Sequence, residues 1–168
     1  MKDSMKQEWN DDAVIVPSSQ NEQFESHGNR LKVIVPTTIT NNHFGLYDIE
    51  MEPKARGPKL HYHKLMDETF ILKEGVLTVL TAKGSIQVEA GSVIHIPRLS
   101  VHGYNNDTNN VVKMTMIFNP GLHRENFFRE MYKMLDEHPD DLKAFQQLYL
   151  ENDSYALNEE DMIPMRKV

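Results

Sequence analysis

Short apolar segments rich in β-branched and aromatic residues fill the middle of the chain. From Leu31 to Phe118 they alternate with polar turns, and no helical spacing intervenes. The segments expected as strands are 31–35, 44–51, 68–72, 76–82, 85–89, 93–96 and 111–118. Turn residues such as Gly75 and Gly91 separate them. Closely spaced short strands of this kind predict an all-β fold, an antiparallel sandwich or barrel.

A helical period replaces the strand pattern after Pro120. Apolar residues recur at helical spacing over 127–135, and a second stripe begins at Leu142, beyond an interruption at His138-Pro139. We expect two helices that pack on the barrel or on a partner subunit. The chain is accordingly divided into an N-terminal arm at 1–30, a β-barrel at 31–120, and C-terminal helices with a tail at 121–168.

The arm at 1–30 is rich in Asn, Gln, Ser, Asp and Glu. Its apolar surface is confined to Trp9 and the segment 14–17. Such a composition is typical either of disorder or of an extended piece that pairs with a sheet edge. Both interpretations stay open, and no function is assigned to the arm.

Charge and cysteine content narrow the classes of partner and site. The net charge is 18 − 25 = −7, and the chain has eight histidines and no cysteine. Disulfides, thiolate nucleophiles and cysteine-held zinc or iron–sulfur sites are therefore excluded, so that any metal is bound through nitrogen and oxygen. Without a run of Lys or Arg, neither nucleic acid nor a membrane surface is an expected partner. We expect a small molecule or another protein.

The compartment follows from what the sequence lacks. No apolar run approaches the roughly 18 residues that span a bilayer, and the polar start at 1–4 lacks the apolar stretch of a signal peptide. We therefore expect a cytoplasmic protein.

Two histidines and a glutamate form one half of a candidate metal site. In a strand the side chains of His61 and His63 point to the same face, because the side-chain period is two. Glu68 follows across a short turn at 64–67, which lets the chain reverse and offer a carboxylate from the neighbouring strand. The pair of imidazoles alone is a weak signal, since two histidines in a strand are common without a metal.

A third histidine supplies the other half. Gly91 starts a turn, a short strand follows, Pro97 ends it, and His102 comes five residues later, where the chain returns over the sheet. Three neutral imidazoles and one carboxylate suit a divalent Mn, Fe, Co, Ni, Cu or Zn ion and leave positions for water or substrate.

Together the two segments resemble the two sequence motifs of the cupin superfamily. The first motif runs His-x-His, three or four residues, Glu, six residues and Gly, and residues 61–75 match it throughout. The second runs Gly, five residues, Pro-x-Gly, two residues, His, three residues and Asn, and its matching positions are Gly91, Pro97, His102 and Asn106. The resemblance spans about residues 31–130 and implies a cupin double-stranded β-helix, or jelly-roll barrel, with a C-terminal helical extension.

Two motif glycines are replaced, and two further segments narrow the resemblance. Ala55 stands where the first motif usually opens on glycine, with Gly57 nearby, and Leu99 replaces the glycine two residues after Pro97. These changes concern turn geometry rather than the ligands.

Residues 67–75 (DETFILKEG) and 118–130 (FNPGLHRENFFRE) are similar to segments of single-domain conserved-barrel cupins related to quercetin 2,3-dioxygenase.

Strand parity also predicts the wall of a pocket beside the metal. If Glu68 and His102 face inward, so do Phe70 and Tyr104, and Met116 lies on the inner face of the last strand. These three residues are the predicted substrate-binding residues. Each of them is also compatible with an ordinary core position.

The resemblance implies one divalent transition metal held by His61, His63, Glu68 and His102. It further implies a metal-dependent dioxygenase, an oxidoreductase acting on an enol or phenol, with Glu68 as the catalytic base. The alternative is a metal-containing cupin that binds a small molecule without turning it over, because one fold serves many functions. A ligand-dependent DNA-binding regulator is disfavoured, since the chain has no basic helix-turn-helix segment.

One outward residue bears on the oligomeric state. Ile71 faces away from the predicted barrel interior and needs cover from the C-terminal helices or from a second subunit. A homodimer is therefore expected.

Overall fold

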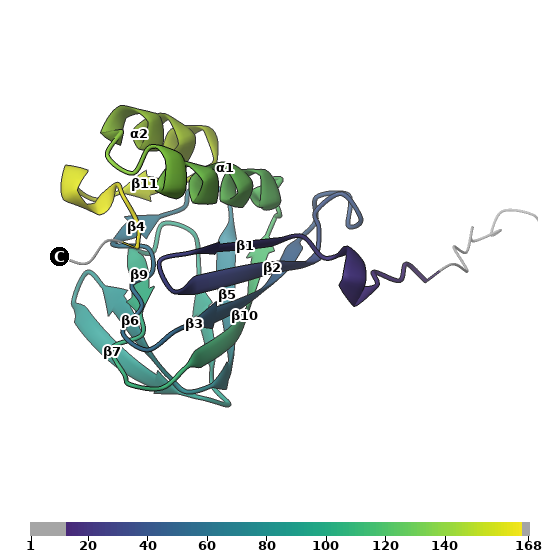
Figure 1. Cartoon of the computed structure of the whole chain (residues 1–168), viewed down its shortest axis with the longest axis horizontal. Helices are drawn as coiled ribbons and strands as arrows, with labels where there is room; N and C mark the ends of the chain where they lie inside the picture. Colours follow the sequence, from purple (N-terminus) through teal and green to yellow (C-terminus); the bar gives the residue numbers. More distant parts are fainter. Residues whose placement is uncertain (1–12, 166–168) are drawn as a thin grey trace, which may run out of the picture.

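The computed structural model describes residues 13–165 and places two antiparallel sheets face to face, with a helical layer beside them (Figure 1). The strand order is β1-β2-β3-β10-β5-β8 in the six-stranded sheet and β11-β4-β9-β6-β7 in the five-stranded sheet. The strands are β1 (Gln23–Ser26), β2 (Asn29–Val35), β3 (Gly45–Met51), β4 (His61–Tyr62), β5 (Asp67–Glu74), β6 (Val76–Thr81), β7 (Gly84–Glu89), β8 (Val93–Ile96), β9 (His102–Asn105), β10 (Val112–Asn119) and β11 (Tyr155–Ala156). The predicted all-β jelly-roll barrel is confirmed.

Each strand expected from the alternation of apolar and polar residues is present, with ends that differ by at most two residues. The pattern did not predict β1, β9 or β11, and a strand at β4 was expected from the spacing of His61 and His63 alone. Their sequences, QFES, HGYN and YA, are polar or too short to show a period. Pairing with a neighbouring strand, rather than local preference, makes these residues extended.

The first described residues do not pair with the sheet at the apolar segment 14–17 but only further along the chain. Residues 13–17 form no regular structure, and Ser18–Gln20 is a short 3₁₀ turn. Pairing with the sheet begins at β1, whose Gln23 lies opposite Lys32 of β2. Part of the segment 1–30 is therefore an edge strand, whereas Trp9 lies outside the described residues.

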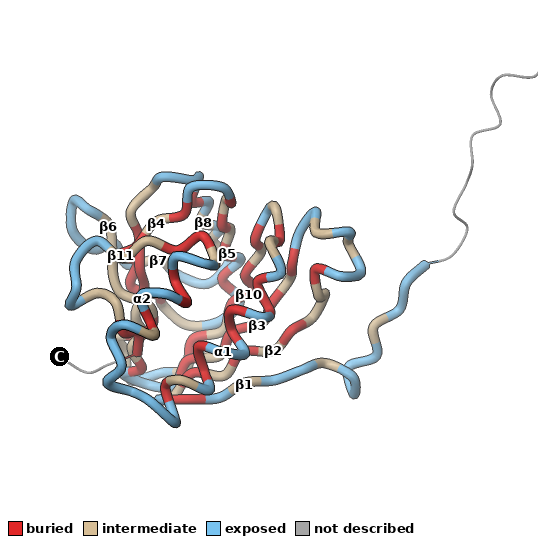
Figure 2. The backbone as a smooth tube through the Cα atoms, turned by 90° about the horizontal axis from the view of Figure 1, so that it is seen from above, coloured by how far each residue is buried: buried red, intermediate tan, exposed pale blue. Residues whose placement is uncertain are grey.

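The core lies between the two sheets, and its most buried strands are β3 and β10 in the middle of the six-stranded sheet (Figure 2). On β5, Phe70 and Leu72 are fully buried whereas Ile71 is 40% exposed. Phe70 lies opposite Met116 of β10, which is also buried. The inward parity predicted for these strands is therefore present.

Two helices follow the barrel, as expected from the change of period: α1 (Arg124–Glu137) and α2 (Leu142–Glu151). The Asp141 side chain caps α2 by accepting a hydrogen bond from the Ala144 N–H at 3.0 Å. The apolar face of α1 is buried through Phe127, Phe128 and Met131. No helix in residues 13–165 is long and apolar enough to cross a membrane.

The residues after α2, expected as a tail, return to the barrel. β11 pairs with β4, placing Ala156 opposite His61, and a short 3₁₀ turn follows at Glu159–Asp161. The Met165 N–H donates to the Gly57 main-chain oxygen at 3.0 Å, and the Met165 side chain is buried. This C-terminal segment therefore closes one side of the barrel.

Candidate metal centre

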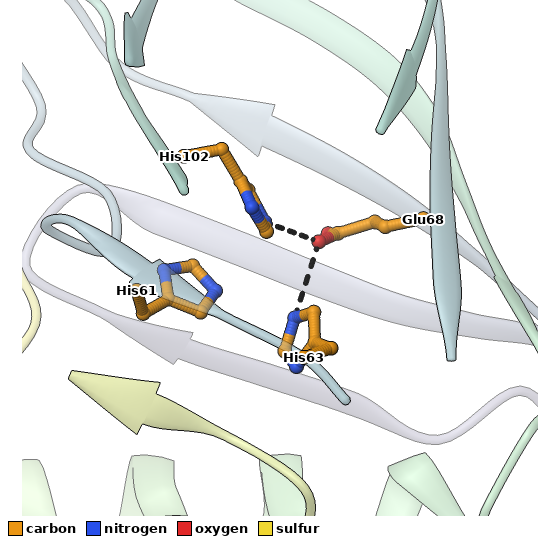
Figure 3. Close-up of side chains that lie close together, drawn as sticks. All are labelled: His61, His63, Glu68 and His102. Atoms are coloured by element: carbon orange, nitrogen blue, oxygen red, sulfur yellow. Dashed lines mark hydrogen bonds and ion pairs between the residues drawn. The ribbon is translucent and has the colours of Figure 1, made fainter. Parts of the chain in front are cut away.

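Three histidines and one glutamate converge between the two sheets (Figure 3). We call His61, His63, Glu68 and His102 the His–Glu cluster. One potential ligand atom from each lies within 4.8 Å of those of the other three, and all four side chains are buried. The residues that the sequence motifs paired are thus brought together in space.

The cluster joins both sheets. His61 on β4 lies directly opposite His102 on β9, and their ring centroids are 4.3 Å apart. Glu68, in contrast, lies on β5 in the facing sheet, opposite Phe118 of β10. The expectation that Glu68 comes from a strand next to the histidines is therefore wrong, because the turn at 64–67 carries the chain from one sheet to the other.

Asp153 holds this turn. Its carboxylate accepts hydrogen bonds from the main-chain N–H groups of Lys64, Leu65 and Met66 at 3.0, 2.8 and 3.2 Å. A buried main-chain donor such as that of Met66 needs such a partner. The crossing between the sheets is therefore fixed by a residue that lies after α2.

Each imidazole of the cluster is oriented by a main-chain oxygen. The Nδ1 atoms of His61, His63 and His102 lie 2.8, 2.6 and 2.9 Å from the carbonyl oxygens of Lys59, Asp153 and Ser100. A carbonyl only accepts, so each Nδ1 carries the proton and donates it. The Nε2 atoms are left with lone pairs, which is the tautomer and orientation of a metal-binding histidine.

The contacts at Nε2 fit a cation. The Nε2 of His102 lies 2.7 Å, and that of His63 3.4 Å, from Oε2 of Glu68. The His63 Nε2 is buried and has no hydrogen-bond partner among the described residues. With the proton on Nδ1, two lone pairs and a carboxylate oxygen face one another, and a divalent cation between them would satisfy all three. The residues present therefore fit a metal ion.

The electrostatics keep the ligands in metal-binding form. Burial lowers the pKa of His61 well below its ordinary value, and neighbouring His102 and His63 lower it further. Burial also lowers the pKa of His63. For Glu68, burial raises the pKa, whereas positive charge at the adjacent nitrogens of His102 and His63 lowers it below its usual range; a cation bound between these atoms would supply the same charge. At neutral pH His61 and His63 are neutral and the carboxylate is ionised.

A cavity adjoins the cluster on the side of α1. His61 and Glu68 line it together with Tyr104 and Met116, two of the predicted substrate-binding residues. The third, Phe70, does not line the cavity but packs edge-on against Tyr104, with 5.3 Å between ring centroids. About 30 Å³ is open to the centres of water-sized molecules, which is room for about two waters.

Two residues of the site went unnoticed in the sequence. Asp153 orients His63 and the turn, and Arg124, the first residue of α1, lines the cavity. No local pattern marks Asp153. Arg124 does carry a signal. A cation in the first turn interacts unfavourably with the helix dipole, so its presence there indicates a role other than stabilising the helix.

Of the two replaced motif glycines, Leu99 but not Ala55 has the backbone conformation that glycine favours. Leu99 has φ 68°, in the left-handed region, and its N–H donates to the His63 main-chain oxygen at 2.6 Å. Gly57 packs against Tyr104 so closely that a Cβ would lie 2.5 Å from the Tyr104 main-chain oxygen. At Gly57, therefore, only glycine fits without a shift of the neighbouring strand.

Comparison with known proteins agrees with this geometry. The family model described as the cupin domain matches residues 47–118, which include the whole His–Glu cluster. A quercetin 2,3-dioxygenase from Bacillus subtilis (strain 168) is 39% identical over 71 residues, or 42% of this chain. The match spans only 20% of that protein, about a fifth of the length of the curated relative.

Solved structures show the same fold at low identity. Ectoine synthase from P. lautus superposes with a TM-score of 0.58 at 15% identity, over 70% of this chain and 86% of that one. The polyketide cyclase RemF from Streptomyces resistomycificus superposes with a TM-score of 0.56 at 16% identity, over 64% and 80% of the two chains. These likenesses concern the fold.

Proposed function

The chain belongs to the cupin superfamily, and we propose that it is a metal-dependent dioxygenase that acts on an enol or a phenol. The observation that carries the proposal is the His–Glu cluster, in which three imidazoles donate through Nδ1 to main-chain oxygens and turn their Nε2 atoms toward one another and Glu68. The partial relative named quercetin 2,3-dioxygenase supports the choice of reaction.

A divalent transition metal held by the cluster would supply Lewis acidity toward a substrate oxygen. Three nitrogens and one carboxylate oxygen serve Fe, Mn, Ni, Co, Cu or Zn alike, so availability selects among these ions. Dioxygen is the oxidant, and both of its atoms end in the product.

The chain's own residues hold the substrate and its proton. Glu68, which is buried and lines the cavity, is the base that accepts the hydroxyl proton of the enol or phenol at a carboxylate oxygen. The aromatic wall of the cavity, with Tyr104 beside Glu68, excludes bulk water. A substrate of flavonol size needs α1 or the C-terminal segment to move, since ligand pockets commonly measure about 300–1,000 Å³.

Oxygen consumption tests the proposal. The protein loaded in turn with each of the six metals is incubated with small enols, phenols and flavonols, in air and under nitrogen. Oxygen uptake that requires both metal and substrate is the expected result, and Glu68→Gln, which keeps the side-chain volume but removes the base, is expected to lower the rate by about 100-fold or more. Absence of uptake for every combination contradicts the dioxygenase.

The same incubation identifies the alternative function. A ligand that binds the loaded protein and is recovered unchanged after prolonged exposure to air indicates a small-molecule-binding cupin without turnover. Both functions need a ligand in the adjoining cavity, so binding alone does not distinguish them. Chemical conversion of the ligand does.

We further propose a homodimer. Ile71 of β5 and its cross-strand neighbour Val93 of β8 are 40% and 63% exposed, and β8 is an edge strand. The helices α1 and α2 do not cover this pair. Light scattering at micromolar concentration is expected to give about twice the mass of the 19.5 kDa chain; a mass of one chain contradicts the dimer. The cytoplasmic location stays a prediction.

A further inference from the structure

Arg124 is a buried cation without a carboxylate partner in residues 13–165. Its exposed fraction is 4%, and no acidic oxygen of those residues lies within 4.0 Å of its guanidinium nitrogens. Nη1 donates to the main-chain oxygen of Asn152 at 2.8 Å and to Ser154 Oγ at 3.0 Å. Nε is buried and has no hydrogen-bond partner among the described residues. Such a donor is costly unless an acceptor meets it.

Aromatic rings surround the guanidinium but supply no acceptor for Nε. Its central carbon lies 3.8 Å from the ring centroid of Phe127, 4.8 Å from that of Phe118 and 5.5 Å from that of Phe128. These contacts stabilise a cation. Burial lowers the pKa of Arg124 to about 10, so the side chain remains charged at neutral pH.

The cation and the His–Glu cluster share one cavity. Arg124, His61 and Glu68 all line it. The ring of Phe118 lies against Arg124 and also 6.0 Å, centroid to centroid, from the ring of His63. A ligand in this cavity therefore meets the guanidinium and the cluster at the same time.

The charges of the cavity require an anion once a metal is bound. With neutral imidazoles, the charges of Glu68 and Arg124 cancel, and a divalent ion leaves two positive charges in excess. An enclosed site of low dielectric does not tolerate such an excess without a counter-charge. The neighbouring Glu125 does not line the cavity, and its carboxylate accepts hydrogen bonds from Thr37 Oγ1 at 2.7 Å and Tyr47 OH at 3.0 Å rather than from Arg124.

We infer that Arg124 binds the carboxylate of a small anionic ligand whose other end lies at the His–Glu cluster. The inference rests on the proposed function for its substrate class, which becomes a carboxylate-bearing enol or phenol. Guanidinium groups match carboxylates in geometry as well as charge. Because the cavity has room for about two water molecules, only a carboxylate of a few heavy atoms enters without movement of α1.

Acetate is the probe, and acetamide is its neutral counterpart of the same shape. Each is titrated into the zinc-loaded and the metal-free protein at constant ionic strength, and the arginine Nε–H resonances are followed by ¹⁵N NMR. We expect acetate to shift the Arg124 Nε–H resonance in the zinc-loaded protein, whereas acetamide leaves it unchanged. An unmoved resonance, or an equal shift with acetamide, overturns the inference.

Variants provide a second measurement. Arg124→Lys keeps the charge but loses Nε, and is expected to weaken acetate binding by about 10–100-fold at unchanged zinc content. Arg129→Lys, an exposed arginine on the same helix that pairs with Glu22, is the matched control and keeps the affinity. Equal affinities in both variants overturn the inference. If Arg124→Lys does not fold, the resonance titration of the unmodified protein decides alone.

The test separates this inference from the proposed function. Acetate binding at Arg124 without oxygen uptake for any substrate supports the carboxylate site and contradicts the dioxygenase. Oxygen uptake with carboxylate-bearing enols whose KM is unchanged in Arg124→Lys supports the dioxygenase and contradicts the role of Arg124.

Discussion

The ring of His63 is oriented by Asp153, a residue 90 positions later in the chain, whose main-chain oxygen accepts the Nδ1 proton at 2.6 Å. The Asp153 carboxylate meanwhile accepts three main-chain N–H groups from the turn that follows His63. One residue of the C-terminal segment thus sets both the direction of a candidate metal ligand and the path of the chain toward Glu68.

Replacing Asp153 is expected to weaken metal binding without removing a ligand. Asp153→Ala leaves three N–H groups of the turn without their acceptor, of which that of Met66 is buried, and lowers the free energy of unfolding by about 2 kcal/mol. Loss of the orientation of His63 lowers the affinity for Zn²⁺ or Co²⁺ by about 10–100-fold. Metal titration and urea denaturation measure the two effects.

Two variants control that experiment. Asp153→Asn keeps one acceptor oxygen and is expected to restore part of both losses. Glu159→Ala removes an exposed carboxylate from the same C-terminal segment and is expected to change neither. Metal affinity that is equal in Asp153→Ala and Glu159→Ala contradicts the positioning role.

Removing His102 tests the metal ligands directly. His102→Ala deletes the imidazole whose Nε2 lies 2.7 Å from Glu68, and the metal content after purification and dialysis is expected to fall from about one ion per chain to well below half. His95→Ala, which removes an exposed histidine outside the cluster, is expected to keep full occupancy. Elemental analysis of both variants decides, and an equal metal content refutes His102 as a ligand.

The metal-free protein is expected to lose stability as the pH falls below about 6.5. Burial lowers the pKa values of His61 and His63 in the folded chain. Below the ordinary pKa of histidine the unfolded chain takes up protons that the folded chain does not, so acid favours unfolding. At about pH 5.5 the loss reaches up to about 1.4 kcal/mol per histidine, and above about pH 6.5 these groups contribute no pH dependence.

Urea denaturation with EDTA at about pH 7.5 and about pH 5.5 measures this effect. In His61→Gln the free energy of unfolding is expected to differ less between the two pH values, by up to about 1.4 kcal/mol, because one of the two histidines with a lowered pKa is gone. The same difference in variant and wild type would show that His61 does not titrate in this way.

Replacing Leu99 by glycine is expected to stabilise the protein. Its φ of 68° costs an L-residue about 1–2 kcal/mol, whereas its side chain is 64% exposed and loses little burial when removed. The greater entropy of glycine in the unfolded chain offsets part of this gain, so Leu99→Gly raises the free energy of unfolding by about 0.5–1 kcal/mol. Leu99→Ala keeps a Cβ at the same φ and is expected to gain less. An equal rise in the melting temperature of Leu99→Ala and Leu99→Gly contradicts the explanation.

Much of the barrel and of the His–Glu cluster was determined by the sequence alone. Alternation along β5 and β10 requires Phe70 and Met116 to face the core, because successive side chains in a strand point to opposite sides. The spacing of His61 and His63 places both imidazoles on one face by the same geometry. Such signals are local, and burial of apolar side chains enforces them wherever the sheets pack.

Only the tertiary structure decided which distant residues complete the site. Glu68 meets the histidines from the facing sheet, Asp153 reaches His63 from beyond α2, and Arg124 enters the cavity from the start of α1. None of these contacts has a sequence period, since each depends on where two packed elements meet rather than on the order of neighbouring residues. The ligand set could therefore be predicted from the resemblance of two segments to the cupin motifs, whereas the contacts that orient the ligands and the position of Arg124 beside them could not.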